Sequence, residues 1–294
     1  MISIRRELFR KVTIIGVGLI GGSLGMALKK HRLAREVVGV SQKQASLTAA
    51  LKMNAIDQAY HEPARAVPNS DLVVLATPVS IITNMLTTIG PHLNRNCIIT
   101  DVGSTKSTIV NFAQDHLPNS VFFVGSHPLT GSEKTGVQFG SADLFQGALC
   151  LMTPGEKTNR PACDRIKRLW SVIGMQVKYM SPEEHDKMLA YVSHVPHVLA
   201  YALMQAIPSS SLEYAAQGLR DTTRIAASSP QMWTDICLNN QKNIIQGLDD
   251  LAKNLSQLRK SINTGDQKTL FNYFKDAKAK RDNLDGIKEK DEPS

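Results

Sequence analysis

The sequence predicts an α/β protein, with a mainly parallel, doubly wound sheet in residues 1–180 and an all-helical region in residues 181–294. Three observations predict this fold class. Short β-branched runs alternate with helix-length amphipathic stretches over the first 180 residues, which is typical of βαβ units. A glycine-rich turn follows the first of these runs. After Ser181 the strand pattern disappears and only helical patterns remain.

Seven segments carry the strand pattern, and helical patterns such as 21–31 and 43–53 lie between them. Right-handed crossovers between parallel strands place such helices on both faces of one sheet. A Rossmann-type domain is therefore expected over residues 1–180. Its expected strands are residues 11–15, 36–40, 71–76, 96–101, 121–125, 148–153 and 176–180.

The helical region opens with a capping signal. Ser181 is the expected N-cap, Pro182 takes the first helical position, and Glu184 follows three residues after the cap. The stretch that follows is long and apolar, and Pro196 inside it is expected to kink the helix. Helical patterns then continue to the end of the sequence, with breaks near 208–211 and 228–230.

Composition limits the class of protein. Hydrophobic residues make up 42% and charged residues 20% of the 294, which suits a sizeable core and excludes a disordered chain. No apolar run approaches the roughly 20 residues that span a bilayer. The N-terminal MISIRRELFRK places charges where a signal peptide has its apolar stretch. A cytoplasmic protein without a membrane segment is therefore expected.

The cysteines and the net charge limit the kinds of metal site and partner that are expected. The four cysteines are scattered without a CxxC pair, which predicts free thiols and no zinc site. The net charge of +8 would suit an anionic substrate or a nucleic acid. The basic residues do not cluster, however, and the lysine-rich tail alternates in sign, so nucleic-acid binding is not expected.

The strongest local motif is a glycine fingerprint directly after the first apolar strand. Gly16, Gly18 and Gly21 form GxGxxG where a helix begins. Gly16 permits the tight turn, Gly18 lets the backbone approach a pyrophosphate, and Gly21 lets helix and strand pack closely. The motif predicts dinucleotide binding, with Leu19 and Ile20 among the contacts.

The residues after the second strand bear on the type of dinucleotide. An acidic residue there would bind the ribose 2′-hydroxyl of NAD. This chain has Ser41, Gln42 and Lys43 instead. A serine hydroxyl with a nearby lysine suits a 2′-phosphate, although Lys43 also fits an ordinary exposed helix residue. The pattern favours NADP over NAD.

Polar residues follow further strands, at the carboxyl edge where this architecture binds ligands. Asp101, which is expected to bind the cofactor, ends the 96–101 strand and Ser104 follows it, while His127 follows the 121–125 strand, toward the nicotinamide end of the cleft. A histidine there can act as a general base at neutral pH, with a serine to orient it; a turn histidine held by backbone hydrogen bonds is the alternative. The residues expected to lie across the cofactor are Ala76, Thr77 and Pro78.

The helical region adds histidines and an arginine. His194 and His197 share a helix face, but no HExxH pattern accompanies them, so hydrogen bonding to substrate or between domains is favoured over metal binding. Arg224 lies shortly before Trp233, and arginine is a bidentate partner for carboxylates. A surface pair with Asp221 is the alternative for Arg224.

Together these segments resemble the prephenate/arogenate dehydrogenase family of tyrosine biosynthesis. The resemblance covers almost the whole chain and implies an N-terminal nucleotide-binding domain with a C-terminal helical domain that forms a homodimer. Five motifs carry it in order: IGVGLIGGSLGMAL, DVGSTK, GSHPLTGSEKTGV, HDKMLAYVSHVPH and GLRDTTRIAASSPQMW.

The resemblance also implies roles for single residues. His127 matches the catalytic histidine, Ser104 the serine near the substrate hydroxyl, and Arg224 the arginine that grips the ring carboxylate. Ser41 looks like the NADP-using members. The implied reaction is the oxidative decarboxylation of prephenate to 4-hydroxyphenylpyruvate with hydride transfer to NAD(P)⁺. Further pocket or domain-interface positions are matched by Ser132, Glu133, His194, His197, Gly218, Asp221 and Trp233.

Three alternatives stay open. Arogenate, the substrate of some members, differs from prephenate only by an amino group in place of the side-chain keto group. A β-hydroxyacid dehydrogenase would need a catalytic lysine early in the second domain, where Lys187 is the obvious candidate, and would leave His127 without a role. A non-catalytic dinucleotide sensor would have no use for a histidine, a serine and an arginine that converge on one cleft.

Overall fold

The computed structural model describes residues 7–131 and 134–290, with side chains as far as residue 284. The chain divides into two compact units, residues 1–243 and residues 244–294. The first unit holds the sheet, its covering helices and the first helices after Ser181. The second unit is helical. The expected α/β class with a helical C-terminal region is confirmed.

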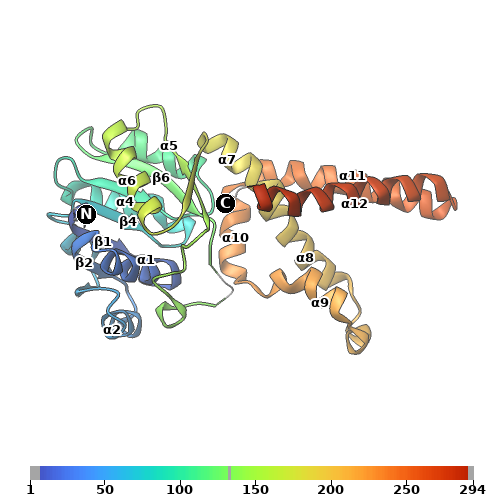
Figure 1. Cartoon of the computed structure of the whole chain (residues 1–294), viewed down its shortest axis with the longest axis horizontal. Helices are drawn as coiled ribbons and strands as arrows, with labels where there is room; N and C mark the ends of the chain where they lie inside the picture. Colours follow the sequence, from blue (N-terminus) through green and yellow to red (C-terminus); the bar gives the residue numbers. More distant parts are fainter. Residues whose placement is uncertain (1–6, 132–133, 291–294) are drawn as a thin grey trace. The chain divides into compact units, whose positions relative to one another are not determined.

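An eight-stranded sheet organises the first unit, in the order β3-β2-β1-β4-β5-β6-β7-β8 (Figure 1). All neighbouring pairs are parallel except β6 and β7, which are antiparallel. The order reverses between β1 and β4, as a doubly wound sheet requires. The strands are β1 (Phe9–Ile15), β2 (Ala34–Val40), β3 (Gln58–Tyr60), β4 (Leu72–Leu75), β5 (Ile98–Asp101), β6 (Phe122–Pro128), β7 (Leu149–Thr153) and β8 (Gln176–Tyr179).

All seven expected strands are present, and β3 is an additional strand at the sheet edge. The four residues of β4 are fully buried because helices cover both faces of the sheet there. By contrast, β3 has only three residues, Gln-Ala-Tyr, and its first is exposed. Such a short, half-exposed segment has no periodic pattern that sequence analysis can recognise.

Two apolar layers lie on opposite faces of the sheet, which confirms the doubly wound arrangement. One layer packs Leu28 of α1 and Trp170 of α6 against the sheet. The other packs Leu86 of α4 and Val110 of α5 against it. The helices of this part are α1 (Leu19–Lys30), α2 (Gln44–Lys52), α3 (Pro63–Ala66), α4 (Val79–Ile89), α5 (Ser107–His116) and α6 (Arg160–Val172).

The helices after Ser181 begin as expected. Ser181 accepts a hydrogen bond from the Glu184 amide, and the Glu184 side chain accepts one from the Ser181 amide, which completes a capping box. A π-helical stretch, Ala190–His194, lies directly before the helix that contains Pro196 in its first turn. The chain thus stays helical up to the proline. The helices here are α7 (Pro182–Leu189), α8 (Val195–Ala206), α9 (Gln217–Thr223) and α10 (Pro230–Asn239).

The second unit is an antiparallel helical pair, α11 (Gln241–Asn263) and α12 (Gln267–Lys290), which lie side by side in Figure 1. Gly265 turns the chain between them with a φ of +64°. Several large apolar side chains on these helices are exposed, among them Ile262 and Phe271. Over the described residues, no helix has the length and apolar character that crossing a membrane requires.

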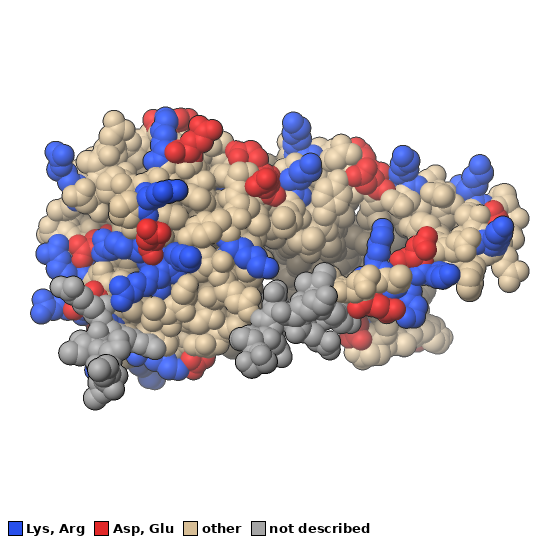
Figure 2. Space-filling model, turned by 45° about the horizontal axis from the view of Figure 1, so that its top comes forward, with Lys and Arg blue, Asp and Glu red and all other residues tan. Residues whose placement is uncertain are grey.

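Charged side chains are distributed rather than gathered. On the face drawn in Figure 2, Lys and Arg are spread over the surface with Asp and Glu between them. Short-range pairs such as Lys30–Asp143, at 2.5 Å, join opposite charges on the surface. On this face, charges of both signs are therefore scattered.

Candidate active site

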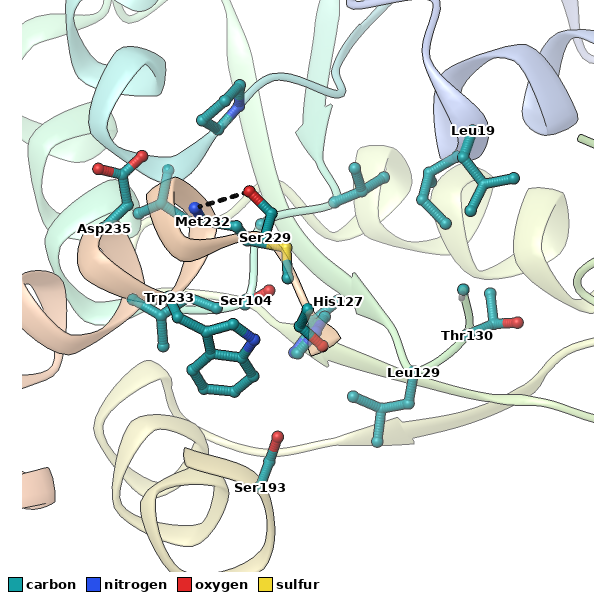
Figure 3. A pocket seen from close by; sticks show the side chains of 18 of the residues that line it. Leu19, Ser104, His127, Leu129, Thr130, Ser193, Ser229, Met232, Trp233 and Asp235 are labelled. Carbon is teal, nitrogen blue, oxygen red and sulfur yellow. Dashed lines mark hydrogen bonds between the residues drawn. The ribbon is translucent and has the colours of Figure 1, made fainter. Parts of the chain in front are cut away.

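A cavity of about 850 Å³ lies at the carboxyl edge of the sheet, within the first unit. The N-terminal end of α1 and the segments that follow β4, β5 and β6 form one side of it, and residues from α7 to α10 form the other. In Figure 3 Ser104, His127 and Trp233 lie close together in this cavity. Parallel strands end at the same edge, which is why residues far apart in sequence meet here.

The glycine turn fits a bound dinucleotide. Gly16 has a φ of +102°, and a Cβ there would collide with the carbonyl oxygen of Ala76. A Cβ at Gly21 would likewise collide with the Gly16 carbonyl oxygen, so these two glycines are needed for the turn itself. Gly18 differs, because a Cβ there would meet nothing within 4 Å. Open space therefore lies over the start of α1, where free N–H groups can bind a pyrophosphate.

A buried chain of hydrogen bonds orients His127. Nδ1 of His127 lies 2.9 Å from Nε2 of His185, and Nδ1 of His185 lies 2.9 Å from Oδ1 of Asp186. The Asp186 carboxylate also accepts hydrogen bonds from the amides of Lys106 and Ser107, at 2.7 and 2.9 Å. These amides open α5, so the carboxylate is fixed at the helix N-terminus.

The direction of this chain determines the tautomer of His127. The Asp186 carboxylate can only accept, so Nδ1–H of His185 donates to it. Nε2 of neutral His185 is then an acceptor, and Nδ1–H of His127 donates to it. Nε2 of His127 is left with its lone pair free for a ligand. His127 also lines the cavity, so the structure presents an acceptor there.

The pKa shifts agree with this assignment. Burial lowers the pKa of His127 well below 6.5, and His185, Lys106 and His194 lower it further. Burial also lowers the pKa of His185, although the hydrogen bond to Asp186 opposes the shift. Burial alone would raise the pKa of Asp186, but hydrogen bonds from His185, Ser107 and Lys106 outweigh it and lower that pKa. At neutral pH this chain of hydrogen-bonded side chains therefore consists of two neutral imidazoles and a carboxylate.

A buried ion pair holds the two strand ends in position. Lys106 and Asp101 form an ion pair in which both side chains are fully buried. Lys106 also donates to the carbonyl oxygen of Ser126, at 3.0 Å, and Asp101 accepts from the amides of Gly103 and Ser126. These bonds connect the Ser104 loop to the strand of His127. Breaking a buried pair of this kind leaves an uncompensated charge, which costs about 3–5 kcal/mol.

The opposite wall presents further donors and acceptors. Asn240 donates to Nδ1 of His194 at 3.1 Å, which leaves Nε2–H of His194 as a donor, and burial lowers the pKa of His194 to about 4. Nδ1–H of His197 donates to the Ser193 carbonyl at 2.8 Å. The ring of His197 stacks on Trp233 at 3.8 Å. Arg224, which opens the 3₁₀ turn Arg224–Ala227, also lines the cavity.

Comparison with known proteins decides the family. Residues 24–179 match the family described as prephenate dehydrogenase, nucleotide-binding domain, and residues 181–276 match prephenate dehydrogenase, dimerization domain. The chain belongs to the prephenate dehydrogenase family. It is therefore an oxidoreductase with a domain for a nicotinamide dinucleotide and a domain of the type that forms homodimers.

Proteins of this family are similar to the chain over most of its length. A prephenate dehydrogenase of Bacillus subtilis is 38% identical over 93% of this chain and 76% of its own. The crystal structure of prephenate dehydrogenase from A. aeolicus in complex with hydroxyphenyl propionate and NAD⁺ has a TM-score of 0.88 at 31% identity, over 96% of this chain and 99% of that one. Synechocystis arogenate dehydrogenase has a TM-score of 0.80 at 27% identity, over 93% and 99%.

Many of the residues singled out from the sequence meet in the cavity, and others lie elsewhere in this family fold. Ser41, Gln42 and Lys43 lie beyond the end of β2. Asp101 belongs to the buried ion pair, and Asp221 accepts from Gln217 on the exposed α9 that also carries Gly218. Ser132 and Glu133 lie outside the described residues. The cavity lining includes Gly18, Leu19, Ile20, Ala76, Thr77, Pro78, Ser104, His127, His194, His197, Arg224 and Trp233.

His185, Asp186 and Asn240 are functional candidates that sequence reasoning missed. The first two are adjacent in sequence, but His185 meets His127 across 58 residues, and no local pattern predicts such a pair. The signal that was available is the His-Asp dipeptide just inside the capped start of α7. Among the described residues, no group of three or more His, Cys, Asp or Glu side chains is arranged to hold a metal ion.

Asp186 is expected to act as a positioning residue. In Asp186→Asn the side chain carries one N–H₂ group, which must face either the Ser107 amide or Nδ1 of His185. If it faces Nδ1 of His185, the direction of each hydrogen bond in the chain of histidines reverses, and Nε2 of His127 carries a proton. We expect kcat to fall roughly 10²-fold at every pH, with KM for the dinucleotide unchanged. Steady-state kinetics across pH measure this. The matched control is Asp143→Asn, which changes an exposed ion pair; an Asp186→Asn enzyme as active as this control would exclude the role.

Proposed function

We propose that this chain is a prephenate dehydrogenase, which converts prephenate to 4-hydroxyphenylpyruvate and carbon dioxide. The observation that carries the proposal is the free Nε2 acceptor of His127, which lines one cavity together with Ser104 and Arg224 beside the phosphate-binding turn. A general base, a hydroxyl group and a guanidinium match the hydroxyl and the ring carboxylate of this substrate.

His127 is the proposed base. Nε2 takes the proton of the C4 hydroxyl, Ser104 orients that hydroxyl, and Arg224 holds the ring carboxylate on the opposite side of the ring. A bound nicotinamide ring supplies the acceptor for the hydride that C4 loses. The low pKa of His127 keeps its base form available at neutral pH, because burial and its charged and histidine neighbours disfavour the imidazolium.

Decarboxylation follows from the electronic structure of the oxidised ring. The new C4 carbonyl is conjugated with the carbon that bears the carboxylate. The C–C bond to the carboxylate breaks, carbon dioxide leaves, and the electron pair of that bond aromatises the ring. The C4 oxygen becomes a phenolate, and His127 returns the proton it took. The enzyme's main task is to position the reacting groups.

Arogenate dehydrogenase is the second candidate, since one similar structure carries that name. The two substrates share the ring and differ in the side chain. Initial rates, followed by reduced-nicotinamide absorbance with prephenate and arogenate and with NADP⁺ and NAD⁺, distinguish the candidates. Turnover of prephenate supports the first, and turnover of arogenate alone supports the second. A folded protein that binds NADP⁺ but turns over neither substrate would be a dinucleotide sensor.

We also infer a preference for NADP⁺. Ser41 and Lys43 follow β2, where the adenosine ribose lies in this architecture, and the amide of Lys43 donates to the Ser41 hydroxyl at 3.2 Å. His61, at the end of β3, has one ring nitrogen 3.0 Å from the Ser41 carbonyl oxygen. The residues 41–44 contain no carboxylate. A hydroxyl and an ammonium at one strand end favour a 2′-phosphate.

Changing this strand end is expected to change cofactor choice. Lys43→Ala should raise KM for NADP⁺ roughly 10-fold or more and leave KM for NAD⁺ unchanged, because a hydrogen bond to a charged group is worth about 1.5–3 kcal/mol. Ser41→Asp should lower the NADP⁺/NAD⁺ ratio of kcat/KM further, because its carboxylate repels the phosphate. Steady-state kinetics with both cofactors measure these effects. Lys52→Ala, at the other end of α2, is the control; equal losses with both cofactors would argue against the assignment.

We further propose a functional boundary at residues 180/181 and a homodimer formed through the helical domain. The two family matches end and begin at 179 and 181, and exposed apolar side chains such as Phe274 on α12 are available for a partner. His194, His197 and Trp233, together with Gly218 and Asp221 on α9, are the proposed further substrate contacts. In the proposed dimer, the partner subunit covers the exposed apolar side chains of α11 and α12.

A further inference from the structure

Asp235 is a carboxylate on the cavity wall that the proposed reaction does not use. It belongs to α10, lines the cavity and is only 8% exposed. Carboxylates buried to this extent are rare unless they are paired with an opposite charge or bind a ligand. The position therefore calls for a partner of suitable chemistry.

Its protein partners are neutral. Oδ2 accepts from the Ser80 hydroxyl at 2.8 Å, and Oδ1 accepts from the side-chain amide of Gln231 at 3.2 Å. Among the ion pairs of the described residues, none involves Asp235. A carboxylate offers about four lone-pair sites, so roughly half of its acceptor capacity remains. A ligand N–H or O–H in the cavity can use it.

The carboxylate lies close to the cavity residues that follow β4. Ser80 is in the first turn of α4, directly after Thr77 and Pro78, which line the cavity at the end of β4. In Figure 3 Asp235 and Leu19 lie on opposite sides of the view, with Ser104 between them. Leu19 opens the phosphate-binding helix α1. A dinucleotide that runs from α1 along the strand ends therefore places its nicotinamide half toward Asp235.

We propose that Asp235 accepts a hydrogen bond from the carboxamide N–H₂ of the bound nicotinamide and so fixes the rotation of the ring. This inference rests on the proposed dinucleotide-dependent function. The carboxamide is a donor, and an acceptor-only carboxylate is complementary to it. The carboxylates of prephenate, in contrast, are repelled by Asp235 and attracted by Arg224. Asp235 would thus hold the cofactor and also disfavour the approach of the substrate's carboxylates to its own position.

The test compares NADP⁺ with its 3-acetylpyridine analogue, which has a methyl ketone in place of the carboxamide and so lacks the N–H₂ group. Dissociation constants are measured by quenching of tryptophan fluorescence, without substrate, so catalysis is not required. We expect the wild type to bind NADP⁺ roughly 10-fold or more tightly than the analogue, as a hydrogen bond to a charged group would give. In Asp235→Ala this ratio should approach one.

Two variants sharpen the test. Ser80→Ala removes the bond to Asp235 but keeps the carboxylate, so the ratio should persist. Asp235→Asn keeps the shape of the side chain and should leave only a few-fold ratio, since neutral hydrogen bonds are about half as strong. The same ratio in Asp235→Ala as in the wild type, or no discrimination in the wild type, overturns the proposal. So does an Asp235→Ala enzyme that keeps the wild-type binding ratio but changes its relative steady-state rates with arogenate and prephenate, which would assign Asp235 to the substrate amine. If the wild type binds neither dinucleotide, the proposed function itself fails.

Discussion

Replacing His127 with asparagine is expected to lower kcat by roughly 10²–10⁴-fold, the range typical of lost general acid–base catalysis. Asparagine keeps a polar side chain in the cavity but cannot take the hydroxyl proton of the substrate. The dissociation constant for NADP⁺ should remain within about two-fold of the wild type, because His127 belongs to β6, whereas the phosphate-binding turn follows β1. Stopped-flow and steady-state rates with prephenate, together with fluorescence titration of the cofactor, measure both quantities.

His92→Asn is the matched control, since His92 is an exposed histidine on a 3₁₀ turn away from the cavity lining. It should leave kcat unchanged. A His127→Asn enzyme with the same kcat as this control would remove His127 from the mechanism. A simultaneous loss of cofactor binding would instead indicate that the substitution disturbed the β6 strand end.

The same base predicts the pH dependence of the wild type. A histidine with a lowered pKa stays unprotonated to lower pH, and burial, His185, Lys106 and His194 lower the pKa of His127 well below 6.5. We therefore expect kcat/KM to stay level from about pH 8 to about pH 6.5 and to decline only below that. A half-loss of kcat/KM at or above pH 6.5 would contradict the lowered pKa.

Arg224→Ala is expected to raise KM for prephenate strongly while KM for NADP⁺ stays unchanged. Loss of a guanidinium that pairs with a bound carboxylate costs about 2–5 kcal/mol, or roughly 30-fold to several thousand-fold in kcat/KM. The effect should fall mainly on KM, because the carboxylate is held both in the ground state and in the transition state. Arg224→Lys should recover only part of the loss, since an ammonium cannot bind a carboxylate in the bidentate manner.

Arg220→Ala provides the comparison for this position. Arg220 is exposed on α9, one helical turn before Arg224, and does not line the cavity. Its removal should change KM for prephenate by less than two-fold, about the effect of an exposed charge. If Arg220→Ala and Arg224→Ala raise KM equally, the effect comes from the general charge of this surface and not from a carboxylate contact in the cavity.

The sheet was predictable from the sequence because buried parallel strands produce short, continuous apolar runs, as in Leu72–Leu75. The position of His127 was predictable for a related reason, since residues that follow parallel strands meet at one edge. The reversed direction of β7 was not predictable, because the direction of a strand depends on its pairing with β6 and not on its own residues. The strand β3 is too short to produce a pattern.

The orientation of His127 could not be predicted for a different reason. Which ring nitrogen faces a ligand depends on the partner of the other, and that partner is His185 on a helix 58 residues away. The sequence contains no signal for a contact at this distance. Asp235 is a similar case, since Ser80 approaches it across 155 residues. Sequence patterns thus indicated candidates such as His127 and Ser104 that line the cavity, while long-range packing determines their protonation and direction.

The most direct test of the proposed reaction is to measure carbon dioxide and reduced nicotinamide together, from prephenate and NADP⁺, with the wild type and with His127→Asn. We predict that the wild type releases one carbon dioxide for each nicotinamide reduced. His127→Asn, which still binds NADP⁺, should lose both in the same proportion. Reduction without release of carbon dioxide, or neither product from folded wild-type protein that binds NADP⁺, would contradict an oxidative decarboxylation that depends on His127.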